Sequence, residues 1–191
     1  MKFVVFLKKL WFFIWHDDSL LSWIVNLVLA FVLVKFIIYP GFGALLGTNY
    51  PIVAVVSGSM EHRGLGFDNW WEKNKDWYQE HNIDREMFEE FSFKDGFNKG
   101  DIMILKGIKP KDIKIGDVLV YENSIHSNPI IHRVVEIKEG NRFITKGDNN
   151  PGPDGSDITE NQIKKTGKAV IRVPLLGWIK IWFVSIFKIN L

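Results

Sequence analysis

The sequence predicts a mainly β protein: an antiparallel, barrel-like β domain that is membrane-anchored by one N-terminal transmembrane helix and carries a short helical insertion. Three observations predict this fold. Residues 19–39 form a long apolar run, and most of residues 51–60 and 100–174 consists of short β-branched runs separated by turn residues. Residues 67–97 interrupt the β pattern with aromatic residues at helical spacing.

Composition narrows the class of protein. The 191 residues suit one compact domain with additional segments. Lys and Arg number 24 against 22 Asp and Glu, and no basic stripe with interleaved aromatics occurs, so the sequence does not predict a nucleic-acid partner. The absence of cysteine excludes disulfides, thiol nucleophiles and Cys-ligated zinc.

Residues 19–39 read SLLSWIVNLVLAFVLVKFIIY. As a helix they would extend roughly 31 Å at about 1.5 Å per residue, enough to cross the hydrocarbon core of a bilayer. A cleavable secretory signal has a shorter apolar core of about 7–15 residues, so the pattern predicts an uncleaved signal anchor. The alternative is a buried core helix of a soluble protein.

Flanking cations predict the direction of this anchor. Lys2, Lys8 and Lys9 precede it, whereas the next cation after it is Arg63. Cytoplasmic flanks carry the excess of Lys and Arg, so the N-terminus is expected in the cytoplasm. Accordingly, we assign residues 1–18 to a cytoplasmic or interfacial segment, with Phe3–Trp15 as an interfacial helix, and residues 40–174 to an extracytoplasmic β-rich domain.

A second apolar stretch closes the sequence. Residues 175–191 are predicted to associate with the membrane. Lys180 lies near the middle of this run, which favours a helix in the interface over one that spans the bilayer. Both arrangements remain open.

The β domain is predicted from short runs bounded by Gly, Asp and Asn. Their spacing favours antiparallel pairing. The predicted strands lie within residues 51–60, 100–107, 115–123, 128–140, 141–148 and 167–174.

The insertion, residues 67–97, is expected to form two short amphipathic helices. Trp70, Trp71, Trp77 and Tyr78 lie one and two turns apart in the first, and Asp84 is a plausible N-cap of the second. Two arrangements are open. The aromatic side chains either enter the lipid headgroup layer or form a cap packed on the β domain.

Candidate catalytic groups are few. Ser57 and Ser59 flank Gly58, which permits a tight turn, but a serine needs an adjacent base and such triplets are usually plain loops. His132 lies within a predicted strand, where its side chain is held rigidly; the alternative is a half-buried structural histidine.

Acidic residues cluster between Thr145 and Asp157, in TKGDNNPGPDGSD. One of Asp148, Asp154 and Asp157 could orient an imidazole. Asp, Asn and Gly at this density also bind calcium or form plain Asx turns. The residues themselves leave all three alternatives open.

Five motifs in order resemble the type I signal peptidases, closest to the archaeal kind and the catalytic subunit of the endoplasmic reticulum complex. The resemblance covers most of residues 19–177 apart from the insertion. The motifs are SGSM at 57–60, GDIMIL at 100–105, IGDVLVY at 115–121, PIIHRVVEI at 129–137 and TKGDNNPGPD at 145–154.

The resemblance implies roles for particular residues. Ser59 matches the nucleophile, and His132 matches the position at which bacterial relatives carry a lysine base, which is the mark of a Ser-His-Asp branch. Asp154 is preferred as the residue that orients His132, although Asp148 could do so or could brace the loop. Asp101 matches a structural turn. The resemblance implies neither a metal nor a cofactor.

Substrate contacts are expected next to the nucleophile. The Ser57 hydroxyl and the Ser59 N–H would stabilise the oxyanion. Ile52, Val53 and Val55 precede the nucleophile on a predicted strand, with which an extended substrate is expected to pair.

The implied function is a membrane-bound serine endopeptidase that removes N-terminal signal peptides from secretory pre-proteins at the outer membrane surface, cutting after small residues. Its partners would be pre-proteins and the lipid bilayer, with accessory subunits open. The alternative is a membrane-tethered β domain that binds or scaffolds without catalysis. One departure is His62, where family members usually have proline, so the turn after Ser59 is expected to be looser.

Overall fold

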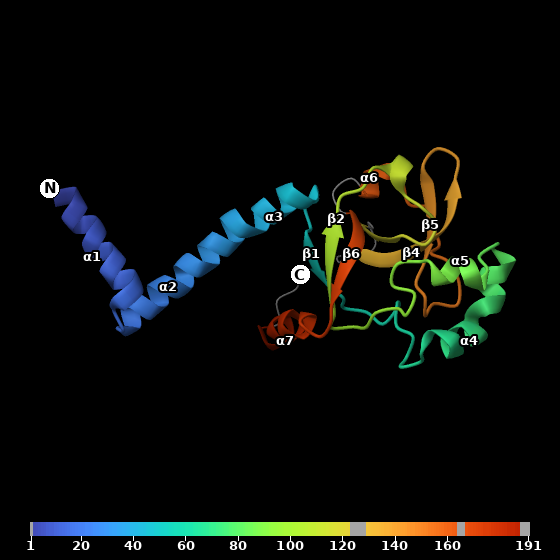
Figure 1. The fold of residues 1–191 in the computed structure, drawn as a ribbon, viewed down its shortest axis with the longest axis horizontal. Helices are drawn as coiled ribbons and strands as arrows, with labels where there is room; N and C mark the ends of the chain where they lie inside the picture. The colour runs from blue at the N-terminus through green and yellow to red at the C-terminus, as the bar shows by residue number, and fades with distance from the viewer. Residues whose placement is uncertain (1, 123–128, 164–166, 188–191) are drawn as a thin grey trace. The chain divides into compact units, whose positions relative to one another are not determined.

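The computed structural model describes residues 2–122, 129–163 and 167–187 (Figure 1). The predicted strands at 115–123 and 128–140 each reach one residue outside these ranges, and residues 188–191 of the C-terminal segment also lie outside them. The chain divides into two compact units, residues 1–45 and 46–191, and each is described by itself.

The N-terminal unit contains α1 (Lys2–His16) and α2 (Leu20–Leu33). Ser19 caps α2, because its side chain accepts a hydrogen bond from the Ser22 N–H. Two polar side chains of α2 donate to carbonyls near the end of α1: Ser22 Oγ to Phe13 O at 2.6 Å, and Asn26 Nδ2 to Ile14 O at 2.9 Å. These bonds satisfy polar groups that would otherwise face an apolar environment.

The helix that begins at α2 is longer than the predicted anchor. It continues through a π-helical turn, η1 (Val34–Ile38), into α3 (Tyr39–Leu46), and so runs to Leu46 rather than ending at Tyr39. Pro40 lacks an N–H, and the π-helical turn directly precedes it, where the backbone pattern must adjust. Among the described residues, Leu20–Leu46 is the one helix long and apolar enough to cross a membrane.

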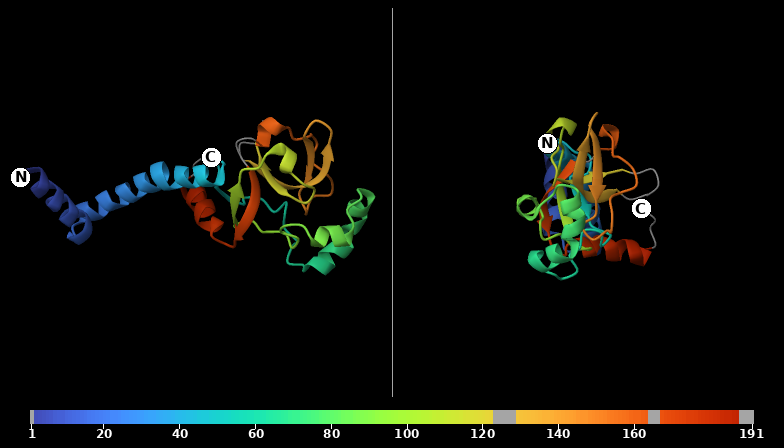
Figure 2. Two further views of the ribbon diagram at one scale, coloured as in Figure 1. Left: turned by 45° about the horizontal axis from the view of Figure 1, so that its top comes forward. Right: turned by 90° about the vertical axis from the view of Figure 1, so that its right-hand side faces the viewer.

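The second unit is built on one six-stranded antiparallel sheet, which confirms the predicted mainly β class. Its spatial order is β1-β2-β6-β3-β4-β5, so β1 and β5 form the edges. The sheet curls strongly, as Figures 1 and 2 show. The strands are β1 (Ile52–Ala54), β2 (Ile102–Lys106), β3 (Val118–Tyr121), β4 (Ile130–Lys138), β5 (Arg142–Lys146) and β6 (Gly167–Val173).

The first strand is shorter than predicted. It ends at Ala54, and residues 57–60 form a turn in which the Glu61 N–H donates to Gly58 O at 3.2 Å. Met60 is fully buried in a core cluster with side chains of β2, β3, β4 and β6. Burial of this side chain draws the turn onto the sheet and ends the extended run.

The helical insertion forms a cap on the β domain. It contains α4 (Phe67–Glu80) and α5 (Arg85–Glu89), and Asp84 caps α5 as predicted by accepting from the Met87 N–H. Its aromatic side chains are buried in a cluster that includes Val135 of β4 and Ile144 of β5. Of the two open arrangements, burial of Trp70, Trp71 and Tyr78 inside the protein favours the cap packed on the β domain, and Trp77 is partly buried against the same cluster.

Three short helices complete the unit: η2 (Pro110–Asp112), α6 (Glu160–Ile163) and α7 (Gly177–Phe187). α7 packs near β1, and the Gly177 N–H donates to Gly100 O at 2.8 Å. Asp101 ties this corner together by accepting from the backbone N–H groups of Asn98 and Leu175, as expected for a structural turn. The 11 residues of α7 extend roughly 16 Å, about half a bilayer core.

Candidate active site

Two serines stand on the turn that follows β1. Their hydroxyls lie close together, with Ser57 Oγ 3.2 Å from Ser59 Oγ. Asn149, from the loop after β5, holds this turn: its N–H donates to Ser59 O at 2.8 Å and its side-chain amide donates to Gly58 O at 3.0 Å. The loop with the acidic cluster is therefore fastened directly to the turn with the serines.

His132 lies on β4 and pairs with Asp154. The His132 Nδ1 to Asp154 Oδ2 distance is 2.7 Å, and Tyr121 OH also donates to Asp154 Oδ2 at 2.9 Å. Burial alone would raise the pKa of Asp154, but the hydrogen bond from His132 and its charge outweigh that effect and lower the pKa. Asp154 therefore stays ionised and fixes the imidazole, leaving Nε2 for other partners.

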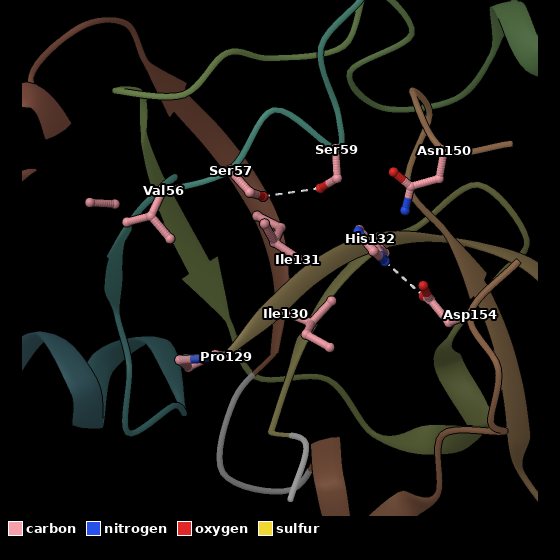
Figure 3. A pocket seen from close by; sticks show the side chains of 10 residues that line it. Val56, Ser57, Ser59, Pro129, Ile130, Ile131, His132, Asn150 and Asp154 are labelled. Atoms are coloured by element: carbon pink, nitrogen blue, oxygen red, sulfur yellow. Dashed lines mark hydrogen bonds and ion pairs between the residues drawn. The ribbon is translucent and has the colours of Figure 1, made fainter. Parts of the chain in front are cut away.

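One cavity of about 440 Å³ brings these groups together (Figure 3). Ser59 and His132, which are far apart in the sequence, both line it, and Figure 3 shows them facing the same space. In the described part of the chain, Ser59 Oγ is bonded to Ser57 rather than to His132. The full lining is Ala54, Val56, Ser57, Ser59, Pro129, Ile130, Ile131, His132, Asn150 and Asp154.

Gly147 forms a tight point beside this cavity. A Cβ atom there would lie 2.7 Å from Ser59 O, 2.8 Å from Asn150 Nδ2 and 2.9 Å from His132 Nε2. The space between these three atoms holds the hydrogen of Gly147 and has no room for a methyl group.

Replacing Gly147 by alanine is expected to lower the rate of any reaction at this cavity by about tenfold to a hundredfold. The methyl group must displace Ser59, His132 or both, and a shift of about 1 Å in a catalytic group can cost about a hundredfold. Turnover of wild-type and Gly147→Ala protein on the same substrate checks this. Gly152→Ala is the control, because a Cβ there meets no atom within 4 Å; equal rates for both variants would contradict the expected crowding.

The residues predicted to contact substrate differ from the residues that line the cavity. Val55 is 2 % exposed and lies in the core, and its N–H and C=O bond to Asp101 and Gly100, so the expectation that it lines the site is wrong. Ala54 and Val56 line the cavity instead. Side chains alternate along an extended chain, so Ala54 and Val56 face the cavity while Val53 and Val55, one position away, pack against the core. Ile52 is exposed and Val53 is half-buried, and neither lines the cavity.

Asp148 pairs with Arg133 rather than with His132. It is fully buried and takes both bonds of a bidentate pair with Arg133, at 2.9 Å and 2.8 Å. Burial would raise the pKa of Asp148, but the Arg133 charge and its hydrogen bonds hold it at about 2. Of the two acids, Asp154 contacts the imidazole, whereas Asp148 contacts Arg133.

Sequence reasoning missed Arg133 and Lys146. All five guanidinium donors of Arg133 are used, two on Asp148 and the others on backbone carbonyls of Ser92, Phe93 and Gly116. Strand alternation could have revealed Arg133, because the neighbour of a cavity-facing His132 must face the opposite side. Lys146 is buried under the insertion, and burial lowers its pKa to about 8.

The turn after Ser59 is firmly packed, contrary to the expectation that His62 loosens it. His62 is 3 % exposed, its ring stacks on Trp70, and Nε2 lies 3.4 Å from Asp148 Oδ2. Stacking and burial thus restrain the segment in which proline was expected.

The acidic cluster shows no sign of the calcium alternative. Asp148 pairs with Arg133 and Asp154 with His132, while Asp157 pairs with Lys138 and Arg142. Each of these carboxylates thus already has a side-chain partner. Across residues 2–122, 129–163 and 167–187, no group of three or more His, Cys, Asp or Glu side chains could hold a metal ion.

Comparison with known proteins gives consistent matches. No protein-family model matches the chain. The chain is 34% identical over 168 residues to the signal peptidase complex catalytic subunit SEC11 of Komagataella phaffii, with 80% of this chain and 78% of that protein covered. It is 29% identical to SEC11 of Zygosaccharomyces rouxii over 167 residues, covering 82% of this chain and 80% of that protein. Human SEC11C is 28% identical over 153 residues, 75% of this chain, and the match spans only 62% of the length of SEC11C.

Proposed function

Because the chain belongs to the type I signal peptidase family, in the branch of the SEC11 catalytic subunits, we propose that it is a membrane-bound serine endopeptidase. Its substrates are secretory pre-proteins, from which it removes N-terminal signal peptides by cutting after small residues. The observation that carries this proposal is the arrangement of Ser59, His132 and Asp154 on one cavity, with His132 bonded to Asp154 at 2.7 Å.

The mechanism assigns one role to each group. Ser59 Oγ attacks the scissile carbonyl while His132 Nε2 takes its proton. Asp154 holds the Nδ1–H of His132 and stabilises the imidazolium that forms. His132 then gives the proton to the leaving amine, and the same imidazole activates the water that releases the acyl group from Ser59. In this mechanism the Ser59 hydroxyl first exchanges its partner Ser57 for His132.

The oxyanion is stabilised by the Ser59 N–H and the Ser57 hydroxyl. Ser57 lines the cavity and its Oγ lies 3.2 Å from Ser59 Oγ, close to the position where negative charge develops. A single donor of this kind typically contributes about 100- to 1000-fold to the rate.

An extended substrate pairs with β1, which is an edge strand of the sheet. Val53 is paired with Met103 of β2, and the Val55 backbone groups also bond toward the β2 side. In an antiparallel strand the alternate residues direct their backbone groups the other way, so Ile52, Ala54 and Val56 offer theirs to substrate. Ala54 and Val56 also supply apolar walls of the cavity, which suits small substrate side chains.

The membrane arrangement follows the predicted segments. Residues 19–39 cross the membrane, and their helix continues beyond it to Leu46. Residues 1–18 lie on the cytoplasmic side, residues 40–174 lie outside with the insertion 67–97, and residues 175–191 rest in the interface. The apolar side chains of Leu20–Leu46 are almost all exposed, with 6% of its most apolar window buried, unlike a soluble core helix. Exposed apolar residues also cover α7: Ile179, Trp182, Phe183 and Ile186.

Incubation of the full-length protein in detergent with a model pre-protein tests the function. The expected result is a product whose N-terminus follows a small residue, and no product with Ser59→Ala. An intact substrate with the wild-type protein, under conditions in which the pre-protein binds, would favour the non-catalytic scaffold. Because the relatives are named subunits of a complex, accessory subunits are proposed partners, and the assay is repeated with host membranes added.

A further inference from the structure

The helical insertion reaches the turn that carries Ser59. The Trp70 ring of α4 stacks on His62, with ring centroids 3.9 Å apart and an interplanar angle of 1°. Both side chains are buried, at 3 % exposure each. His62 follows Ser59 by three residues, so this stack fixes the chain just beyond the nucleophile.

Gly96 and Phe97, at the C-terminal end of the insertion, contact the same turn. The Phe97 N–H donates to Met60 O at 3.0 Å. Gly96 lies so close that a Cβ there would be 2.4 Å from Met60 O and 2.6 Å from His62 Cδ2. The turn is therefore held between α4 and the segment that leaves the insertion.

The strand that carries His132 depends on the insertion as well. Arg133, the next residue, donates to Ser92 O at 2.8 Å and Phe93 O at 2.9 Å, and its guanidinium lies 4.9 Å from the Phe88 ring centroid. Tyr78 OH donates to Asp148, the partner of Arg133, at 3.4 Å. The insertion thus contacts both the turn that carries Ser59 and the strand that carries His132.

We propose that Trp70 and His62 are positioning residues: their stack holds the turn at the place where Ser59 Oγ meets His132 Nε2. This inference rests on the proposed function, in which those two atoms react. Neither ring lines the cavity, so the stack acts on the catalytic step rather than on substrate binding.

Trp70→Leu and Trp71→Leu form a matched pair of variants. Both remove one buried indole from adjacent positions of α4, with exposures of 3 % and 1 %, but the His62 stack belongs to Trp70. Trp70→Leu is expected to lower kcat by about tenfold to a hundredfold with KM unchanged. Trp71→Leu, assayed below its melting temperature, is expected to keep kcat, and Trp70→Phe, which keeps a ring for stacking, is expected to recover most of it.

Hydrogen exchange of the amides of residues 57–62 decides the inference even if no cleavage is found. Exchange is expected to be about tenfold faster in Trp70→Leu than in wild type and unchanged in Trp71→Leu. An inactive wild type with this exchange pattern refutes the proposed function and leaves the positioning intact. Equal exchange, or equal kcat, in the two leucine variants refutes the positioning. If either leucine variant fails to fold, His62→Leu, which removes the other ring of the stack, is compared with Trp71→Phe in the same two measurements.

Discussion

Replacing His132 by alanine is expected to lower the rate constant for pre-protein cleavage by at least about 10,000-fold while leaving the domain folded. The hydroxyl of Ser59 is a weak nucleophile without a base, and loss of one member of such a group removes nearly all of its combined effect. The fold should persist because Asp154 keeps its bond from Tyr121 when the imidazole is gone. Single-turnover cleavage with excess enzyme measures the loss, and circular dichroism checks the fold.

Asp154→Asn tests the same assignment through a second residue. The asparagine preserves the shape of the loop, but its amide can donate to His132 Nδ1 and so favours the tautomer with the proton on Nε2. That tautomer cannot accept the Ser59 proton, and the comparable change in a serine protease costs about 10,000-fold. Cleavage near the wild-type rate by either variant would contradict the assigned roles.

Replacing Asp148 by alanine is expected to lower the free energy of unfolding by about 3–5 kcal/mol. The change leaves Arg133 fully buried, with two of its hydrogen bonds lost and no close carboxylate among the described residues to balance its charge. His62 and Tyr78 lose a bond partner at the same time. Thermal or denaturant unfolding of the full chain in detergent measures the loss.

Asp157→Ala is the control for Asp148. Asp157 pairs with Lys138 and Arg142, whose side chains are 37% and 53% exposed, so its removal should cost at most about 1 kcal/mol. Similar losses for both variants would contradict a special role for the buried pair.

The same pair sets a pH dependence. The pKa of Asp148 is lowered to about 2 in the folded protein from an ordinary 3.8, so its stabilising contribution is complete above about 4 and disappears as pH falls through about 2. Stability of the wild type should therefore fall across this window, and the Asp148→Ala variant should show a smaller fall.

Much of the fold was predictable because local signals were strong. β-branched runs bounded by Gly and Asp gave the strands, and the spacing of Asp84 before Met87 gave the cap of α5. The helix end was not predictable in the same way. Pro40 and Gly41 normally stop a helix, yet the π-helical turn lets this one continue to Leu46.

The candidate site was also predictable only in part. Ser59, His132 and Asp154 were selected by motifs along the chain, but sequence could not choose between Asp148 and Asp154, since both lie in one turn-rich loop. Contacts in the folded protein distinguish the two acids: Asp148 pairs with Arg133, and Asp154 pairs with His132. The His62–Trp70 stack joins two segments that share no sequence motif, so no local pattern predicts it.

The most direct test of the central claim, that Ser59 and His132 act as one unit, is the cleavage rate of the double variant Ser59→Ala/His132→Ala beside the two single variants. If the two residues act together, all three variants should show the same residual rate to within about tenfold. A double variant slower than either single variant by the product of their separate losses, or a His132→Ala protein that cleaves at the wild-type rate, would contradict it.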